Sequence, residues 1–355
     1  MSTFEPRPQI REMSGYHSPQ VDVPVRLNTN ESPFPPPASW VESLVDVARE
    51  VAWNRYPDRS AARLRTAIAE RHGVGVGNVF VANGSNEVLQ TILLTYGGHG
   101  RTVAMFEPTY QMYGQIARIT GAEVVTGNRD AGFALDEGEI ARVLSESSPA
   151  VTFLCNPNNP TGVVESRANV EALVASATGI VVVDEAYAEF ADWSAVDMVT
   201  EDSPLVVTRT FSKTLSMAAL RVGYAIGPEW LISQLQVAVL PYHLDSFKQA
   251  ATVAALSYVD EMESRVAMIK AERARIESRL IARGIAVWPS GANFVLFRPD
   301  AHASGASVWS LLLERGILVR DCGSWPRLEG CLRVTVGTEA ENDAFLDAVD
   351  AIVGV

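Results

Sequence analysis

The chain has 355 residues, 47% hydrophobic and 20% charged, an ordinary globular composition with length for about two domains. Its formal net charge of −13 argues against nucleic-acid binding, which uses basic surfaces. The three cysteines lack metal-ligand spacing, the first residues lack a signal-peptide pattern, and no apolar run has the length of a membrane span. We therefore expect a cytoplasmic protein without nucleic-acid or membrane partners.

Residues 1–38 are rich in proline and polar side chains. This composition predicts an extended N-terminal arm that packs with a small domain and a partner surface, or else a disordered tail. Helical patterns follow over residues 39–53 and 60–72. A break at Pro57 separates them, because the residue before a proline is disfavoured in a helix.

From residue 79, short apolar segments alternate with helical patterns at 87–96, 137–146 and 167–176. Strands that are apolar throughout are typical of a parallel sheet covered on both faces. Residues 39–245 are therefore expected to form a large α/β domain with a mostly parallel sheet and helices on both faces. The expected strands are 79–82, 102–106, 123–125, 150–154, 180–184, 205–209 and 223–226.

The pattern changes after Pro241. Residues 246–283 predict one or two long helices with a charged, solvated face. Short strands and two further helices follow, so residues 246–355 predict a smaller α+β domain. The expected elements are strands 286–288, 294–297, 317–319 and 332–336, and helices 306–315 and 340–353.

Lysine is scarce, and one of the three copies, Lys213, closely follows a predicted strand. Asp184 ends another strand, and Arg221 lies eight residues beyond Lys213. Pyridoxal phosphate requires these three groups: an amine for a Schiff base, a carboxylate for the pyridine nitrogen and a cation for the phosphate. A lone loop lysine is usually solvated, but this combination favours a pyridoxal phosphate site.

A glycine-containing turn follows the first strand and opens a helix. Gly84 permits a tight turn, Ser85 or Asn86 can cap the helix, and the free backbone N–H groups point at an anion. Alone, this motif predicts only a helix cap. Together with Ser212 and Arg221 it predicts a phosphate cup.

Three further side chains follow strands of the predicted sheet. Tyr110 is either a core aromatic or a platform for a flat ring. The proline-rich loop 156–162 is either a simple turn or a rigid support for the Asn159 amide. Asn159 and Tyr187 can both donate to the cofactor's 3′ oxygen, and desolvation would lower the pKa of Lys213 so that it can act as a nucleophile and proton carrier.

Arg333 lies within an apolar strand of the second domain, where a buried charge needs a partner. It predicts either a bidentate contact with a substrate α-carboxylate or a structural ion pair. Arg320 follows the preceding predicted strand, and the same two roles are predicted for it on weaker grounds.

Together these motifs resemble those of pyridoxal phosphate enzymes with the aspartate-aminotransferase fold, and among them the histidinol-phosphate aminotransferases of the actinobacterial type. The resemblance covers nearly the whole chain. It is carried by residues 27–31, 55–58, 83–87, 156–162, 183–187, 210–213, 240–244 and 332–338.

The resemblance implies a role for each matching residue. Lys213, Asp184 and Tyr187 would be catalytic, with Lys213 as the Schiff-base lysine and Asp184 on the pyridine nitrogen. The other cofactor-binding residues would be Gly84, Ser85, Asn86, Thr210, Ser212 and Arg221 around the phosphate, Tyr110 on the ring, Asn159 with Tyr187 at the 3′ oxygen, and Tyr56 from the partner of a homodimer. The substrate-binding residues would be Tyr16, Asn30, Tyr242, Arg320 and Arg333, with Arg333 on the α-carboxylate of glutamate or 2-oxoglutarate.

The implied reaction is transamination between L-histidinol phosphate and 2-oxoglutarate, a step of histidine biosynthesis. Two alternatives share the fold: an aromatic amino-acid aminotransferase and, less favoured, a threonine-phosphate decarboxylase. A cofactor-binding regulator is disfavoured because the chain has no basic DNA-binding segment. A nicotinamide dehydrogenase is disfavoured because no G-x-G-x-x-G follows the first strand.

Overall fold

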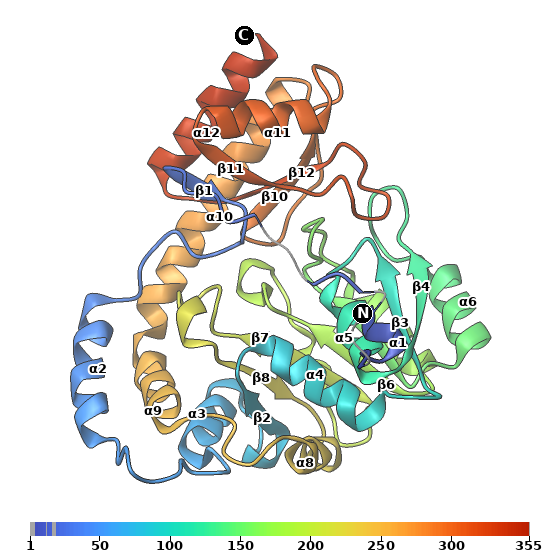
Figure 1. Ribbon diagram of the computed structural model, residues 1–355, viewed down its shortest axis with the longest axis vertical. Helices are drawn as coiled ribbons and strands as arrows, with labels where there is room; N and C mark the ends of the chain where they lie inside the picture. Colours follow the sequence, from blue (N-terminus) through green and yellow to red (C-terminus); the bar gives the residue numbers. More distant parts are fainter. Residues whose placement is uncertain (1–3, 12, 16–18, 355) are drawn as a thin grey trace.

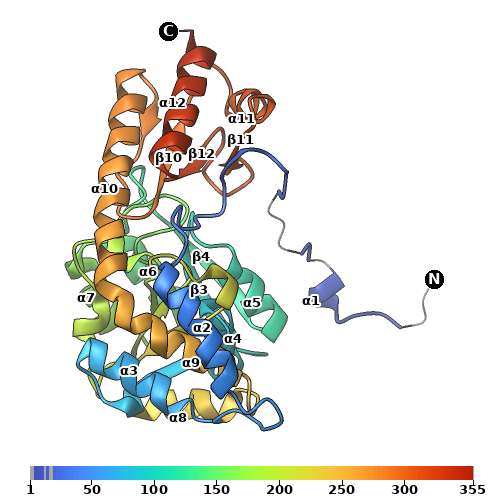
Figure 2. The same ribbon diagram turned by 90° about the vertical axis from the view of Figure 1, so that its left-hand side faces the viewer.

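The protein, in a computed structural model that describes residues 4–11, 13–15 and 19–354, has two sheets, each with its own helices (Figure 1). Short apolar strands form the larger sheet, and the carboxyl-terminal part of the chain forms most of the smaller one. The 24-residue helix α10 (Val259–Ala282) runs from one part to the other (Figure 2). Within the described residues, no helix has the length and apolar character needed to cross a membrane.

The large sheet has seven strands, of which only β8 runs antiparallel to its neighbours. This confirms the mostly parallel sheet. In spatial order its strands are β2 (Val79–Ala82), β8 (Gly223–Ile226), β7 (Leu205–Thr210), β6 (Ile180–Asp184), β5 (Val151–Cys155), β3 (Thr102–Glu107) and β4 (Glu123–Asn128).

Helices cover both faces of this sheet, as expected from its apolar strands. One face packs against α4 (Ser85–Tyr96), α5 (Met112–Thr120) and α8 (Glu229–Ala238). The other packs against α2 (Ala38–Glu50), α3 (Ala62–His72), α6 (Glu137–Ser147), α7 (Arg167–Ser176) and α9 (Ser246–Ala255). Consecutive side chains of a strand therefore enter different cores.

The small sheet has five strands and packs against α10, α11 (Gly305–Glu314) and α12 (Glu339–Val353). Its strands are, in order, β1 (Val25–Leu27), β11 (Ile317–Asp321), β12 (Leu332–Thr335), β10 (Phe294–Arg298) and β9 (Ala286–Val287). Strand β1 comes from the predicted arm and pairs in parallel with β11. Part of the arm is thus an edge strand of the small sheet.

Three features differ from the sequence-based expectation. Helices α5 and α8 were not expected, and neither was the short helix α1 (Pro8–Arg11), which lies beside α5 (Figure 1). The segment 246–283, for which one or two helices were expected, forms two, α9 and α10, joined by the 3-10 turn Leu256–Tyr258. The other 3-10 turns are Val76–Asn78, Ala188–Phe190, Ala195–Met198 and Ala218–Leu220.

Candidate active site

A cavity of about 190 Å³ lies between the carboxyl ends of the large-sheet strands and strands β11 and β12 of the small sheet. The carboxyl edge of a parallel sheet is where α/β folds hold ligands. The predicted residues that line it are Asn30, Ser85, Asn86, Tyr110, Asn159, Asp184, Tyr187, Thr210, Ser212, Lys213, Arg221, Arg320 and Arg333. The chain thus brings together most of the residues that its motifs singled out.

Lys213 follows β7, and its Nζ donates to the Thr29 carbonyl oxygen at 3.2 Å. The pKa of Lys213 is lowered to about 8, chiefly by burial and then by the positive charges of Arg333 and Arg221, while Glu31 opposes them. A larger share of neutral, nucleophilic amine is therefore present near neutral pH than for an exposed lysine.

Asp184 is buried at the end of β6, with two hydroxyl groups on its carboxylate. Tyr113 Oη donates to Oδ2 at 2.8 Å, and Thr208 Oγ1 donates to Oδ1 at 3.1 Å. Burial raises the pKa of Asp184, and these hydroxyls only partly oppose the shift. Within the described residues this carboxylate forms no ion pair, so a protonated ring nitrogen in the cavity would supply its missing countercharge.

The turn before α4 has the geometry of an anion cup. Gly84 has φ +82°, and the helix after it has no side-chain cap, so the expected capping by Ser85 or Asn86 is not seen. The Asn86 side chain instead accepts from Tyr110 Oη at 3.2 Å. The first amides of α4 are thus left uncapped and available to an anion.

The opposite wall of the cup comes from the segment after β7. Arg221 Nη1 donates to Ser212 Oγ at 3.2 Å, and Thr210 Oγ1 donates to the same oxygen at 3.0 Å. A Cβ on Gly84 would lie 2.6 Å from Arg221 Nη2. The guanidinium therefore lies against the glycine backbone, and the residues of the cup fit the phosphate of the expected cofactor.

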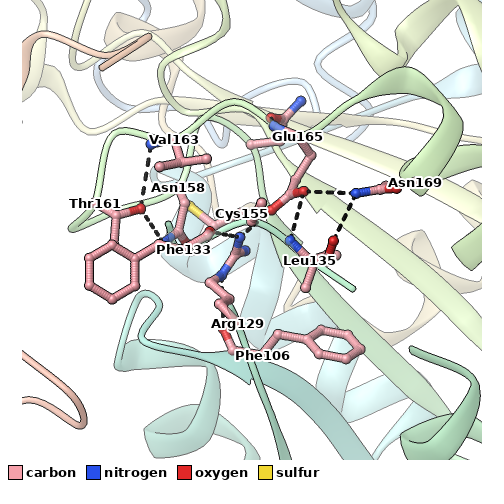
Figure 3. A network of polar contacts seen from close by, with 12 residues as sticks. Phe106, Arg129, Phe133, Leu135, Cys155, Asn158, Thr161, Val163, Glu165 and Asn169 are labelled. Carbon is pink, nitrogen blue, oxygen red and sulfur yellow. Dashed lines mark hydrogen bonds and ion pairs between the residues drawn. The ribbon is translucent and has the colours of Figure 1, made fainter. Parts of the chain in front are cut away.

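Asn159 is held by a loop with its own buried supports (Figure 3). Asn158 Nδ2 donates to Thr161 Oγ1 at 2.8 Å inside the loop. At the end of the loop, the buried Glu165 forms an ion pair with Arg129, which also donates to the Phe133 carbonyl oxygen at 3.0 Å. The loop is thereby fixed at both its middle and its end.

Arg333 carries no acidic partner within the described residues, which disfavours the structural ion pair. Its Nη1 donates to Asn159 Oδ1, and its Nη2 donates to the Asn28 carbonyl oxygen at 3.0 Å. Its buried Nε has no hydrogen-bond partner among the residues that the structure describes. Arg320 pairs with Arg333 in register on the adjacent strand. Both arginines line the cavity, where they can bind an anionic substrate group.

Tyr187 and Asn30 meet at the edge of the cavity, where Asn30 Nδ2 donates to Tyr187 Oη at 3.0 Å. Burial raises the pKa of Tyr187 above 10.0, so its hydroxyl keeps its proton and remains a donor.

Two predicted site residues lie away from the cavity. Tyr56 is 81% exposed and stacks on Tyr242, with ring centroids 4.6 Å apart. Neither lines the cavity of this chain. A third, Tyr16, lies outside the described residues.

Sequence reasoning also missed residues at the site. Thr208 could have been found from the alternation along β7, since it shares a face with Thr210. Tyr113 lies on the unexpected helix α5. Thr29 and Ala186 also line the cavity, and they lie within the segments 27–31 and 183–187 that carried the resemblance. The remaining missed residues line the cavity and gave no sequence signal: Gln111, Cys155 and Trp325.

Comparison with known proteins identifies relatives over the whole chain. Residues 22–349 match the family described as aminotransferase class I and II. Histidinol-phosphate aminotransferases are similar: that of Streptomyces avermitilis is 46% identical over 97% of this chain and 95% of its own length. That of Frankia casuarinae is 44% identical over 97% of this chain and 89% of its own length.

Solved structures share the fold at lower identity. Histidinol-phosphate aminotransferase from Sinorhizobium meliloti, in complex with pyridoxal 5′-phosphate, has a TM-score of 0.90 at 23% identity, covering 99% of this chain and 98% of its own. L-threonine-O-3-phosphate decarboxylase from Porphyromonas gingivalis has a TM-score of 0.80 at 22% identity, covering 93% and 100%. The fold is therefore common to more than one reaction.

Proposed function

The chain belongs to the aminotransferase class I and II family and is a pyridoxal-phosphate-dependent transaminase, and from this premise we propose its substrates and the roles of its residues. The amino group passes between L-histidinol phosphate and 2-oxoglutarate, giving imidazole acetol phosphate and L-glutamate, or the reverse in histidine biosynthesis. The observation that carries this proposal is the 44–46% identity to histidinol-phosphate aminotransferases over 97% of the chain.

The cofactor, when bound, supplies an electron sink for the negative charge that develops at the substrate α-carbon. Lys213 would anchor it covalently and would move a proton at the substrate α-carbon, which suits an amine with a pKa of about 8. Asp184 would hold the ring N–H, Asn159 and Tyr187 would bind the 3′ oxygen, and Tyr110 would stack on the ring. The phosphate would be held by Gly84, Ser85, Asn86, Thr210, Ser212 and Arg221.

The charge of the cavity supports anionic ligands in a protein whose formal net charge is −13. Its lining includes the basic residues Lys213, Arg221, Arg320 and Arg333 against the single acid Asp184. Arg333 takes the α-carboxylate of glutamate or 2-oxoglutarate, for which its fork geometry is suited. Asn30 and Arg320 line the rest of the substrate pocket. Tyr16 and Tyr242 stay in the proposal as substrate-binding residues, although Tyr242 does not line the cavity of this chain.

The proposal also includes that the protein forms a homodimer and works in the cytoplasm. Several large apolar side chains are exposed near Tyr56: Trp53 is 70% exposed, Leu240 77% and Tyr242 43%. An exposed apolar group of this kind is typical of an interaction surface. In the dimer, Tyr56 reaches the partner's cavity and contributes to cofactor binding there.

The test is product formation by the cofactor-loaded protein. Incubation with L-histidinol phosphate and 2-oxoglutarate should release L-glutamate in stoichiometric amounts. Carbon dioxide release from L-threonine O-3-phosphate, without glutamate formation from histidinol phosphate, would instead assign the protein to decarboxylation.

A further inference from the structure

A buried ionic network lies on the sheet face opposite Asp184 and Thr208. Arg209, near the carboxyl end of β7, donates through Nε and Nη2 to Glu185 Oε2 at 3.0 and 2.7 Å. Its Nη1 donates to Glu189 Oε1 at 3.1 Å, and its Nη2 also donates to Ser194 Oγ at 2.7 Å. One arginine thus joins the segment after β6 to β7.

The network continues to the residue next to Lys213. Thr214 Oγ1 donates to Glu189 Oε2 at 3.1 Å. Glu189 therefore accepts from Arg209 with one oxygen and from Thr214 with the other. Thr214 is itself buried. We call Arg209, Glu185, Glu189, Ser194 and Thr214 the Arg209 brace.

Most members of the brace are chain neighbours of residues that line the cavity. Glu185 follows Asp184, Arg209 precedes Thr210, and Thr214 follows Lys213. Because consecutive strand residues point to opposite faces, Arg209 lies on the side of β7 away from Thr208 and Thr210. Lys213 and Thr214 follow the strand, and Thr214 is joined to the brace by its hydrogen bond to Glu189. The register supports this, since Asp184 pairs with Thr208 and the Glu185 N–H donates to the Thr208 carbonyl oxygen at 2.8 Å.

The residue types in the Arg209 brace are better suited to fixing the position of the backbone than to raising the stability of the fold. A buried ion pair contributes little net stability, because desolvation offsets the attraction, but its hydrogen bonds fix a geometry. The Glu185 side chain, which pairs with Arg209, is completely buried. Its carboxylate also accepts hydrogen bonds from the Ala195 N–H and the Ser194 Oγ. Three residues therefore fix the position of this carboxylate.

We propose that Thr214, held by Glu189 and Arg209, is a positioning residue for Lys213, fixing the backbone from which the lysine amine enters the cavity. The inference rests on the proposed role of Lys213. The long lysine side chain must both bond to the cofactor and carry protons, so its movement is productive only if its base is fixed. The Thr214–Glu189 hydrogen bond supplies that fixed point one residue away.

Loss of the Arg209 side chain would leave Glu185 as a buried, unpaired charge and is expected to prevent folding. The informative change is therefore Thr214→Val, which keeps the shape and removes one hydroxyl. Thr214→Ser restores the hydroxyl and is the rescue variant. Thr252→Val is the matched control, since Thr252 is fully buried in α9 and its hydroxyl donates to the Lys248 carbonyl oxygen at 2.7 Å, away from the cavity.

The measurement is rapid mixing of cofactor-free protein with pyridoxal phosphate, with absorbance recording first binding and then covalent attachment. In the second step the neutral Lys213 amine attacks the aldehyde carbon, a carbon–nitrogen bond forms and one water leaves. Thr214→Val should slow this step about tenfold and leave the binding step unchanged, because the phosphate cup is intact. Thr214→Ser and Thr252→Val should match the unmodified protein.

Other results would overturn the proposal. An unchanged attachment step in Thr214→Val would remove the positioning role, and so would equal slowing in Thr214→Ser. Parallel slowing of both steps would indicate general loosening instead of positioning. If the unmodified protein attached no cofactor, the proposed role of Lys213 would itself fail, a result distinct from the others.

Discussion

Asp184 and Lys213 are both removed from water in the cavity, and burial moves their pKa values in opposite directions. It raises that of the carboxyl group and lowers that of the amine to about 8. Both shifts favour the neutral form. A cofactor with a cationic ring nitrogen would reverse the shift at Asp184, while the lowered pKa at Lys213 keeps its amine reactive.

Tyr113 stabilises the charged form of Asp184 through the hydrogen bond that its hydroxyl donates. Tyr113→Phe should weaken pyridoxal phosphate binding about tenfold, because a hydrogen bond to a charged group contributes about 1.5 kcal/mol. The ring should stay in place, since it stacks on Phe153 with centroids 4.7 Å apart. Equilibrium titration of cofactor-free protein measures the effect.

Tyr96→Phe is the matched control for that experiment. The Tyr96 hydroxyl is buried and has no hydrogen-bond partner in the described part of the chain, so its removal should leave both cofactor affinity and stability unchanged. Equal cofactor affinities for Tyr113→Phe and the unmodified protein would show that Thr208 alone suffices to hold Asp184.

The strand–turn–helix unit β2–α4 carries most of the phosphate cup, and Gly84 is its critical position. Its φ of +82° strains any side chain, and a Cβ would meet Arg221 Nη2 at 2.6 Å. Gly84→Ala should therefore cost about 1–3 kcal/mol of stability and also displace the guanidinium. Thermal unfolding and cofactor titration measure the two effects separately.

Gly73 offers a control at the end of α3. It also has positive φ, +64°, but a Cβ there would meet nothing within 4 Å. Gly73→Ala should lose about 1 kcal/mol of stability and keep full cofactor affinity. If Gly84→Ala behaved like Gly73→Ala, the cup would not depend on the approach of Arg221.

The elements that the sequence predicted well are the apolar strands of the large sheet, because each carries its signal locally. Helix α5 was missed since Gly114 interrupts its pattern. The glycine is accommodated by packing, as a Cβ there would lie 3.1 Å from Met105 Cε. Strand β1 was missed because its partner, β11, lies at the other end of the chain. Helix α8, with Leu231, Ile232 and Leu235 on one buried face, had a readable pattern.

At the scale of the molecule, residues that follow strands of the large sheet, residues of the small sheet and the segment after β1 meet in one cavity. The motifs located most of its lining, because strand ends converge at one edge of a parallel sheet. They could not reveal Trp325, which lies in the loop between β11 and β12, nor the position of Tyr56 relative to the cavity. In one chain Tyr56 stacks on Tyr242 at the surface, so the proposed contact of Tyr56 with the cofactor would require a second chain.

Complementation between inactive variants tests that role. Tyr56→Ala and Lys213→Ala dimers should each be nearly inactive. After they exchange subunits, about a quarter of the original activity should return, because each mixed dimer has one intact site. Mixing that restores no activity, although subunit exchange is verified by mass, would place Tyr56 outside the partner's site.

The half-reaction with an amino donor tests the central claim most directly. Cofactor-loaded protein is titrated with L-histidinol phosphate and, separately, with L-phenylalanine, while the visible band of the Lys213-bound cofactor is followed. The account predicts that the band is lost at far lower concentrations of L-histidinol phosphate, because basic residues line the cavity. Preference for L-phenylalanine would contradict it and assign the same fold and cofactor to aromatic amino-acid transamination.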